Sequence, residues 1–283
     1  MAQQSQMTSG PVDAEHISRC LDASDDFSFE MQVLHMLKTA DLNAVTLTAA
    51  HGGTYIDPVT GLPRQFDIRA KLSRERDHSR RNCFLRLSIE CKRLHPNAPL
   101  VISRSQRTAG ESFHDYIRSH FTAGVRPQSG VSKATSSLSF YRQGEFVGRS
   151  VTLVKSGQNV PAGDADIYTK WAQALASVDD LIWEGAEDAR GPAIPIAHST
   201  VLPCLVIPDE TLWTVDYDSE GNRSNPQPAE NCEFYVGKPS AGRARPDKFT
   251  VTHLHIFTIS GFQKFLLRKL ADTEYWLGHF SND

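Results

Sequence analysis

The sequence predicts an α/β protein in which a mixed β-sheet is flanked by helices. Apolar residues recur every three or four positions at 27–41 and 167–187, which is the period of a helix packed on one face. Nearly continuous apolar runs of strand length stand at 83–92, 201–207 and 249–259, as in buried strands. Helical and strand patterns alternate along 283 residues, 40% of them hydrophobic, so the chain can bury a large core.

Composition excludes several other classes of protein. The formal net charge is −3, so the chain as a whole carries no basic signature. Five cysteines without a CxxC pair predict neither a disulfide framework nor a zinc ribbon. No apolar stretch approaches the roughly 20 residues that span a bilayer. The polar segment 1–13 lacks the apolar part of a secretory signal and predicts a flexible leader. We therefore expect a cytoplasmic protein without a membrane partner and with one domain over 14–283.

The first part of the chain combines helices with short strands. We expect, in order, helix 14–21, helix 27–41, strand 44–49 and a hairpin over 54–71. The second helix carries an apolar stripe formed by Phe27, Met31, Leu34 and Leu37. The hairpin turns at residues 57–61, where proline fixes one φ angle and glycine accepts a positive one. The run 83–92 predicts a central strand that is buried on both faces.

The pattern weakens after this strand and returns further along the chain. Residues 94–165 are rich in Ser, Gly and Arg and predict an insertion or lid, with one helix at 111–120. The remaining elements that we expect are helix 167–187, strands 193–198, 201–207 and 212–216, a loop at 218–248, strand 249–259 and helix 262–271.

Charge is unevenly distributed. Ten basic residues stand against four acidic ones from Arg64 to Arg93, whereas residues 178–221 hold ten acids and only Arg190 as a base. A basic segment in an acidic protein is a mild indication of a polyanion partner. Solvated arginines on a loop explain the same pattern equally well.

One group of polar residues stands out at the end of the predicted central strand. Glu90 and Lys92 are two positions apart and share a face of a strand, and Asp67 on the preceding hairpin strand can approach them. Two carboxylates beside a lysine form an oxygen-rich site that suits Mg²⁺ or Mn²⁺, an ion that activates water for attack on a phosphodiester. The alternative is a buried salt bridge without catalysis.

These residues resemble the motif of a known superfamily. The segments YIDP (55–58), RQFDIRA (64–70) and LSIECKR (87–93) resemble the PD-(D/E)xK nucleases, which have the restriction-endonuclease-like fold. The resemblance implies that Asp67 and Glu90 bind the metal together with the carbonyl of Cys91, and that Lys92 is the catalytic lysine. Glu30 on the first long helix matches the acid that the family often carries there; the alternative is an exposed helix carboxylate.

A later helix of the family turns polar residues toward the site. Lys170, Gln173 and Ser177 have one-turn spacing, and Gln173 is our preferred catalytic residue among them, although an ordinary solvent face explains it too. Two features depart from the family. Phe66 replaces the proline before the aspartate, and the insertion at 94–165 has no family role that we can assign, which leaves substrate selection open.

The function that the resemblance implies is metal-dependent hydrolysis of phosphodiester bonds by a nuclease. DNA is the expected substrate because the family mostly acts on DNA, and restriction or antiviral (phage) defence is the expected setting, with a sensor or helicase as a partner protein and a homodimer as one route to double-strand cleavage. The alternatives are a catalytically silent nuclease-fold module for nucleic-acid binding or complex assembly, and an unrelated α/β protein with a chance motif. His253 and His255 share a strand face, but without a third ligand we expect core or surface histidines.

Overall fold

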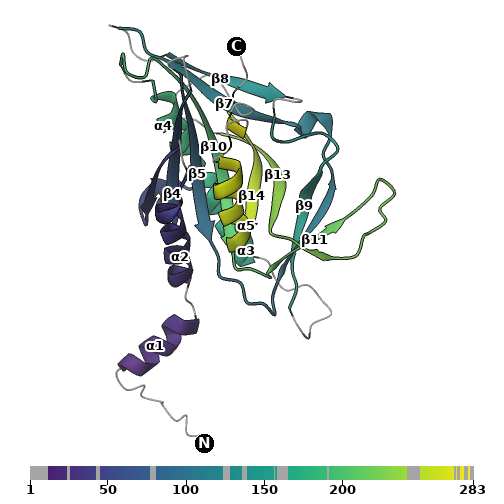
Figure 1. The fold of residues 1–283 in the computed structure, drawn as a ribbon. Helices are drawn as coiled ribbons and strands as arrows, with labels where there is room; N and C mark the ends of the chain where they lie inside the picture. Colours follow the sequence, from purple (N-terminus) through teal and green to yellow (C-terminus); the bar gives the residue numbers. More distant parts are fainter. Residues whose placement is uncertain are drawn as a thin grey trace, which may run out of the picture.

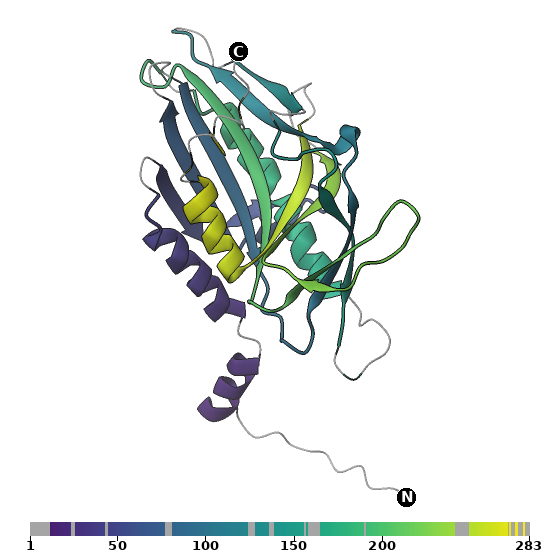
Figure 2. The same cartoon turned by 45° about the vertical axis from the view of Figure 1, so that its right-hand side comes forward.

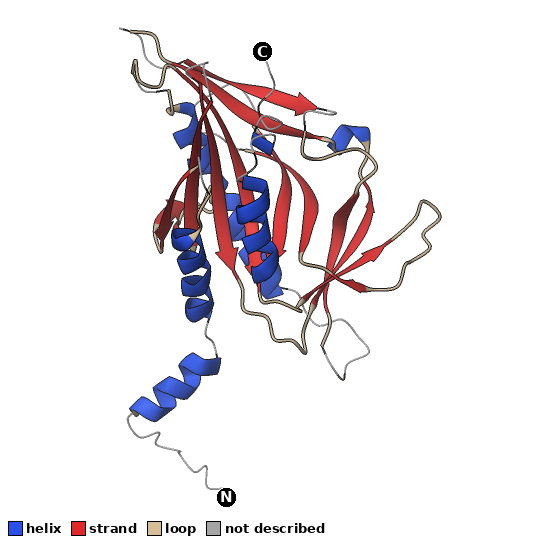
Figure 3. Cartoon of the chain, in the orientation of Figure 1, coloured by secondary structure: helices blue, strands red, loops and turns tan. Residues whose placement is uncertain are grey.

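The chain folds as an α/β structure with one large mixed sheet (Figures 1 and 3). The structure is a computed structural model, and it describes residues 12–23, 26–42, 45–76, 81–123, 128–135, 139–155, 157, 165–189, 191–240, 249–270, 272, 275–276 and 280. The α/β class with a mixed sheet and flanking helices is therefore confirmed. Residues 1–11, most of the predicted leader, lie outside the described part.

Twelve strands of the described chain form this sheet. They are β1 (Thr46–His51), β4 (Ile68–Arg76), β5 (Arg81–Cys91), β6 (Leu100–Gln106), β7 (Phe113–His120), β8 (Gln128–Thr135), β9 (Phe146–Leu153), β10 (Ile196–Ile207), β11 (Leu212–Asp216), β12 (Gln227–Pro228), β13 (Asn231–Pro239) and β14 (Thr250–Thr258). Their order is β1-β4-β5-β10-β14-β13-β9-β6-β11-β12, and β7 joins β10 to β8.

Strand β10 pairs with three other strands, β5, β7 and β14. It runs parallel to β5 along almost its whole length, from Ile196 to Val206. Its other edge is divided, because residues 196–199 pair antiparallel with β7 and residues 204–207 pair parallel with β14. Neighbouring β4 is antiparallel to β5, with Ile68 opposite Ile89. The predicted central strand at 83–92 is thus found as β5, an interior strand between β4 and β10.

Helices cover both faces of the sheet (Figure 2). The first face holds the largest apolar cluster, which joins α2 (Asp26–Thr39) and α5 (Ile259–Lys264) to β4, β5 and β10. The opposite face is covered by α3 (Ala165–Ala176) and α4 (Val178–Ala186), which contact β5 and β10. Helix α1 (Ala14–Ala23) lies apart from the sheet in both views. None of the described helices is long and apolar enough to cross a membrane.

Helix α2 turns a different face to the sheet from the one predicted. Its buried residues are Phe29, Val33, Leu34 and Leu37, whereas Phe27 is 64% exposed and Met31 is 41% exposed. The helix is apolar on most of its circumference, so the spacing alone was compatible with either face. Leu34 and Leu37 were predicted correctly as core residues.

The predicted hairpin is shorter than expected and separate from the main sheet. Strands β2 (Thr54–Ile56) and β3 (Pro63–Gln65) pair with each other, and β4 continues from residue 68 as a long strand of the large sheet. The turn between β2 and β3 has the predicted chemistry, because Asp57 Oδ1 accepts hydrogen bonds from the backbone amides of residues 59 and 60 and Gly61 has a φ of +70°.

Several later elements differ from the predictions. Residues 94–165, predicted as an insertion or lid, contribute β6, β7, β8 and β9 to the sheet, and the predicted helix at 111–120 is strand β7 after a 3₁₀ turn at Ala109–Glu111. Helix 167–187 is interrupted at Ser177, and the two strands predicted at 193–207 are the single strand β10. The predicted loop at 218–248 includes β12 and β13. The last helix continues past α5 as a π-helix, Phe265–Leu270.

Candidate functional site

Strand β5 has one apolar and one polar face. Leu85, Leu87, Ile89 and Cys91 belong to the apolar cluster shared with α2 and α5. The alternate residues Arg86, Ser88 and Glu90 point toward α3 and α4, as the period of two in a strand requires. All of these polar residues are buried, with Glu90 completely inaccessible to solvent. The expectation that β5 is buried on both faces is correct, but one of the faces is polar.

The helices carry matching polar residues at helical spacing. Ser88 Oγ contacts Ser177 Oγ and donates to the carbonyl of Ala174. From β4, Arg69 donates to the carbonyl of Ser177 and to Asp180. We call this contact zone the strand–helix polar interface; it comprises Asp67, Arg69, Lys71, Arg86, Ser88 and Glu90 on the strand side and Lys170, Ser177, Asp180, Glu184 and Asp188 on the helix side.

One end of this interface is the Asp188 cluster. The guanidinium of Arg86 forms two hydrogen bonds of 2.6 Å with the Asp188 carboxylate. Lys71 and Ser199 donate to the same carboxylate at 2.9 and 2.5 Å. Burial acts to raise the pKa of Asp188, but the hydrogen bonds and charge of Arg86, with those of Ser199 and Lys71, outweigh it and hold the pKa below its ordinary value. Asp188 is therefore an ionised, fully bonded carboxylate.

The other end is the Asp67–Glu90 site, which consists of Asp67, Glu90 and Lys170. The Lys170 ammonium lies 3.0 Å from Oδ1 and 2.7 Å from Oδ2 of Asp67, and 3.5 Å from Oε2 of Glu90. Asp67 Oδ2 also accepts a hydrogen bond of 2.8 Å from the backbone amide of Cys91. No group of the described chain donates a hydrogen bond to either carboxyl oxygen of Glu90. The structure thus brings Asp67 and Glu90 together, as predicted from the strand pattern.

The electrostatics of this site follow from burial. Burial first, and then the negative charge of Asp67, raise the pKa of Glu90 to about 9, so this carboxyl group carries a proton at neutral pH. Burial alone would lower the pKa of Lys170, but the charges of Asp67, Glu90 and Glu30 outweigh it and raise the pKa. Lys170 is therefore an ammonium ion at neutral pH, beside the protonated carboxyl group of Glu90.

Two further residues of the implied metal site lie next to this group. Glu30 on α2 is bonded to His51 of β1 at 3.1 Å, and burial together with the charge of Asp67 raises the pKa of Glu30. Cys91 is fully buried in the apolar cluster. Its amide orients Asp67, and the role of its carbonyl as a metal ligand stays a prediction.

Lys92 is held away from the two carboxyl groups. Its ammonium lies 2.9 Å from Asp26 Oδ2 at the start of α2, and the other oxygen of Asp26 accepts a hydrogen bond from the amide of Arg93. The Lys92 amide still donates to the Val206 carbonyl of β10, but its ammonium is paired with Asp26 and not with Glu90.

Two polar side chains near the site have unused hydrogen-bonding capacity. Gln173, which we predicted from the helix spacing, lies one turn after Lys170, and its buried Oε1 has no hydrogen-bond partner in the described chain. The hydroxyl group of Tyr55 is likewise buried and unbonded. Burial first, and then the charge of Glu90, raise the pKa of Tyr55 to about 12. Sequence reasoning missed Tyr55, since a tyrosine on a short hairpin strand carries no signal of its own.

The residues fit a divalent ion that needs few protein ligands. Asp67 and Glu90 converge on one point, which Lys170 Nζ marks, and both oxygens of Glu90 are free of hydrogen bonds. Mg²⁺ is commonly held by one or two carboxylates, with water and phosphate oxygens completing the octahedron. Within the described ranges, no group of three or more His, Cys, Asp or Glu side chains is arranged to hold a metal ion. The described residues thus provide two converging carboxyl groups and no complete cage of protein ligands.

The basic segment at 64–93 has partners inside the chain. Arg69 is paired with Asp180, Arg86 with Asp188, and Lys71 with the same Asp188. Arg64 contacts Asp57 in the hairpin turn. These ion pairs account for part of the charge imbalance that indicated a polyanion partner, because Asp180 in α4 and Asp188 just after α4 pair with three of these strand residues.

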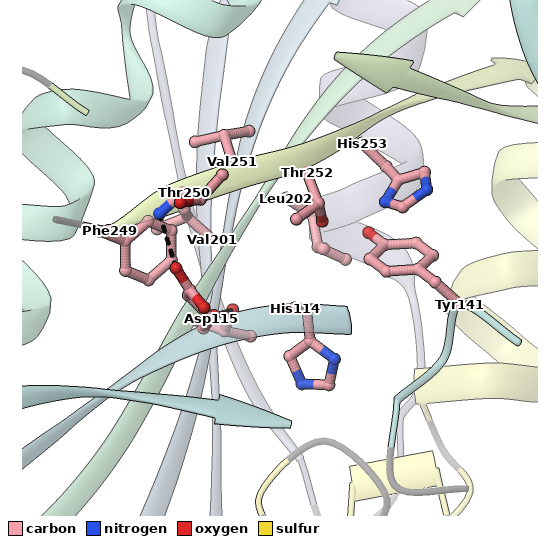
Figure 4. A pocket seen from close by; sticks show the side chains of 11 residues that line it. His114, Asp115, Tyr141, Val201, Leu202, Phe249, Thr250, Val251, Thr252 and His253 are labelled. Atoms are coloured by element: carbon pink, nitrogen blue, oxygen red, sulfur yellow. Dashed lines mark hydrogen bonds between the residues drawn. The ribbon is translucent and has the colours of Figure 1, made fainter. Parts of the chain in front are cut away.

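A second group of polar side chains lines a small cavity on the other side of β10 (Figure 4). His253 stacks on the ring of Tyr141 with centroids 3.6 Å apart, and the Tyr141 hydroxyl is 2.8 Å from His255 Nε2. Burial lowers the pKa values of His253 and His255 to about 2 and about 3. Asp115, at the far end of the cavity, accepts a hydrogen bond from the amide of Thr250. The two histidines are core residues, as expected.

No known protein family, curated protein or solved structure matches this chain. The function of the chain is therefore inferred from the geometry of its candidate site. Lys170 is the residue that sequence reasoning underestimated: its spacing with Gln173 and Ser177 was recognised, but Gln173 was preferred. The signal was a lysine one helical turn before Gln173, on the helix that was expected to turn polar residues toward the two carboxylates.

Proposed function

We propose that this chain is a metal-dependent nuclease that hydrolyses phosphodiester bonds at the Asp67–Glu90 site. The observation that carries the proposal is the convergence of two buried carboxyl groups on one cation, while the oxygens of Glu90 receive no hydrogen bond. A buried carboxyl group without donors is costly to a fold unless it binds a ligand or acts in a reaction.

Each residue of the site has a definite task in such a reaction. The Cys91 amide orients the Asp67 carboxylate, and Asp67 together with the deprotonated form of Glu90 would hold a divalent cation. When bound, Mg²⁺ or Mn²⁺ supplies an activated water and stabilises charge on the phosphate. In the hydrolysis, the water loses a proton as its oxygen bonds to phosphorus, one P–O ester bond breaks, and the leaving oxygen takes up a proton.

The arrangement also supports the finer assignment to the PD-(D/E)xK nucleases with their restriction-endonuclease-like fold. Asp67 directly precedes β4, Glu90 stands at the end of the antiparallel neighbour β5, and an acid-bearing helix, α2, lies on the other face. DNA as substrate, a role in restriction or phage defence, a sensor or helicase partner, homodimer formation and a cytoplasmic location follow from this family assignment and are part of the proposal.

A second candidate function is a catalytically silent nuclease-fold module that binds nucleic acid or assembles a complex. The observation in its favour is the position of the Lys170 ammonium, which by itself balances the charge of Asp67. In that case the site is a buried salt bridge that holds α3 on the sheet.

The deciding experiment is a cleavage assay. Supercoiled, linear and single-stranded DNA and RNA are incubated with Mg²⁺, Mn²⁺ or EDTA. We expect metal-dependent cleavage that Asp67→Asn reduces by at least about 100-fold. Asp180→Asn is the matched control, because it changes a carboxylate of the same interface that is 45% exposed and bonded to Arg69. Absence of cleavage with retained nucleic-acid binding would favour the silent module.

A further inference from the structure

Two lysines, Lys92 and Lys170, are candidates for the cationic residue of the proposed reaction. The E-x-K motif assigns the role to Lys92, whose ammonium is held by Asp26. Lys170 of α3 contacts both carboxyl groups of the site instead. We infer that Lys170, and not Lys92, is the lysine of this site, and that it stands where a divalent cation binds until the cation displaces it. This inference rests on the proposed function.

The position of Lys170 is set by the packing of its helix. Helix α3 is fixed on β5 by the contact between Ser177 and Ser88 and by the hydrogen bond from Ser88 to the Ala174 carbonyl. Lys170 lies two turns before Ser177 on the same face, so its side chain extends over the end of β5, where Glu90 is found. The scaffold of the strand–helix polar interface therefore directs the ammonium to the carboxyl groups.

The position of Lys92 is set by a different element. Asp26 begins α2, and its carboxylate binds both the Lys92 ammonium and the Arg93 amide. A carboxylate in the first helical turn is also favoured by the helix dipole. Lys92 thus fastens the start of α2 to the end of β5, and moving it into the site would break these contacts.

A cation at the Asp67–Glu90 site has to take the place of the ammonium. Lys170 Nζ is within hydrogen-bond distance of both oxygens of Asp67, so a metal ion that uses this carboxylate cannot share the position. After displacement, the lysine remains tethered to α3 beside the site. There its charge is available to the phosphate group, whose negative charge increases in the transition state.

The displacement has a signature that a purely structural lysine would not give. Removing the ammonium removes a competitor of the metal and at the same time removes a positive charge needed for turnover. We expect Lys170→Met to raise the affinity for Mn²⁺ at least tenfold and to lower the cleavage rate at saturating Mn²⁺ at least 100-fold. The cleavage rate of Lys92→Met should remain at least tenfold higher than that of Lys170→Met. Lys264→Met, on a surface ion pair with Glu230, is the control for both readouts.

The Mn²⁺ affinity is measured by calorimetric titration of the full chain, and the rate by single-turnover cleavage. Equal or weaker Mn²⁺ binding by Lys170→Met overturns the inference but leaves the proposed function intact, as does full activity of this variant. A larger loss with Lys92→Met than with Lys170→Met also overturns it. If neither the wild-type chain nor any variant binds Mn²⁺, the proposed function itself fails.

A second measurement uses only the wild-type chain, in case Lys170→Met does not fold. Lysine acetylation is followed by mass spectrometry with and without Mn²⁺. The side chains of Lys170 and Lys92 are 19% and 24% exposed, so they are closely matched within one sample. We expect Mn²⁺ to increase the acetylation rate of Lys170 severalfold and to leave that of Lys92 unchanged. A Lys170 rate that stays the same or decreases overturns the inference.

Discussion

The two ends of the strand–helix polar interface hold carboxyl groups that are equally buried but differently bonded. Asp188 is 4% exposed and accepts four hydrogen bonds, from Arg86, Lys71 and Ser199. Glu90, fully buried on the same side of the sheet, accepts none from the described chain. One carboxyl group is ionised with a lowered pKa, whereas the pKa of the other is raised to about 9.

This difference separates a structural ion pair from a candidate site. Buried charges stabilise a fold only when their geometry and hydrogen bonds offset the loss of hydration. The Asp188 cluster meets this condition, so it joins α4 to β5 and leaves no capacity for a ligand. The Asp67–Glu90 site does not meet it, and its unused oxygens are the feature that a cation or a substrate can exploit.

The largest expected effect comes from neutralising each carboxyl group in turn. We expect Asp188→Asn to lower the free energy of unfolding by about 3–5 kcal/mol, because Arg86 then remains charged and buried with a weakened partner. At pH 7 Glu90 is protonated in the folded chain but ionised in the unfolded chain, so Glu90→Gln should not lower the free energy of unfolding and should raise it instead. Urea unfolding at pH 7 measures both.

Each variant is the control for the other, because both changes replace a buried carboxyl group by the isosteric amide. Circular dichroism before unfolding checks that the secondary structure is retained. A loss for Glu90→Gln as large as that for Asp188→Asn would mean that Glu90 is an ionised structural group, and the contrast between the two ends would not hold.

The pH dependence of stability sharpens the comparison. The folded chain holds the proton of Glu90 up to about pH 9, whereas the unfolded chain releases it near the ordinary value of 4.5. This contribution to stability is therefore complete below pH 4.5 and is lost as the pH rises toward 9. Relative to Glu90→Gln, we expect the wild-type free energy of unfolding to fall by up to about 1.4 kcal/mol per pH unit between pH 6 and 8.

Asp188 has the opposite pH window. Its pKa is lowered, so its contribution is present above the ordinary value of 3.8 and is lost as the pH falls through the folded-state value. The stability difference between the wild-type chain and Asp188→Asn should be constant from pH 6 to 8. Urea unfolding over this range tests the contrast: a difference between the wild-type chain and Asp188→Asn that changes with pH as steeply as the difference for Glu90→Gln would contradict the assignment.

The smallest expected effect lies between the two ends. Asp180 pairs with Arg69 at 3.3 Å but is 45% exposed, and Arg69 keeps the Ser177 carbonyl and the ring of Phe66 as partners. Asp180→Asn should therefore change the free energy of unfolding by less than about 1 kcal/mol. A thermal unfolding curve indistinguishable from that of the wild-type chain is the expected result; a loss above 2 kcal/mol would show that the middle of the interface is as dependent on charge as the Asp188 cluster.

Much of the fold could be predicted where the pattern is local. The strands β5 and β14 follow from continuous apolar runs, and the carboxyl group of Glu90 was recognised because it interrupts such a run. Strand β7 was mistaken for a helix, since a segment of eight residues with mixed polarity fits either period. Strand β13 was taken for a loop because its flanks are rich in Pro and Gly.

The site was only partly predictable because its partners lie far apart in the sequence. The meeting of Asp67 with Glu90 follows from two neighbouring strands, but Lys170 is about a hundred residues away and reaches them through the packing of α3. The ion pair between Lys92 and Asp26 depends on where α2 begins. Neither contact has a local signature, and the same is true of the ion pairs that neutralise the basic segment.

The divided edge of β10 has a consequence for how the chain acquires its structure during synthesis. The parallel partners β5 and β10 are more than a hundred residues apart, and residues 204–207 also await β14, which ends at residue 258. Such distant pairings form slowly. Strand β5, which carries Glu90, therefore leaves the ribosome long before its parallel neighbour β10. One edge of residues 204–207 in β10 stays unpaired until β14 is made. We expect the nascent chain to need protection from aggregation during this interval.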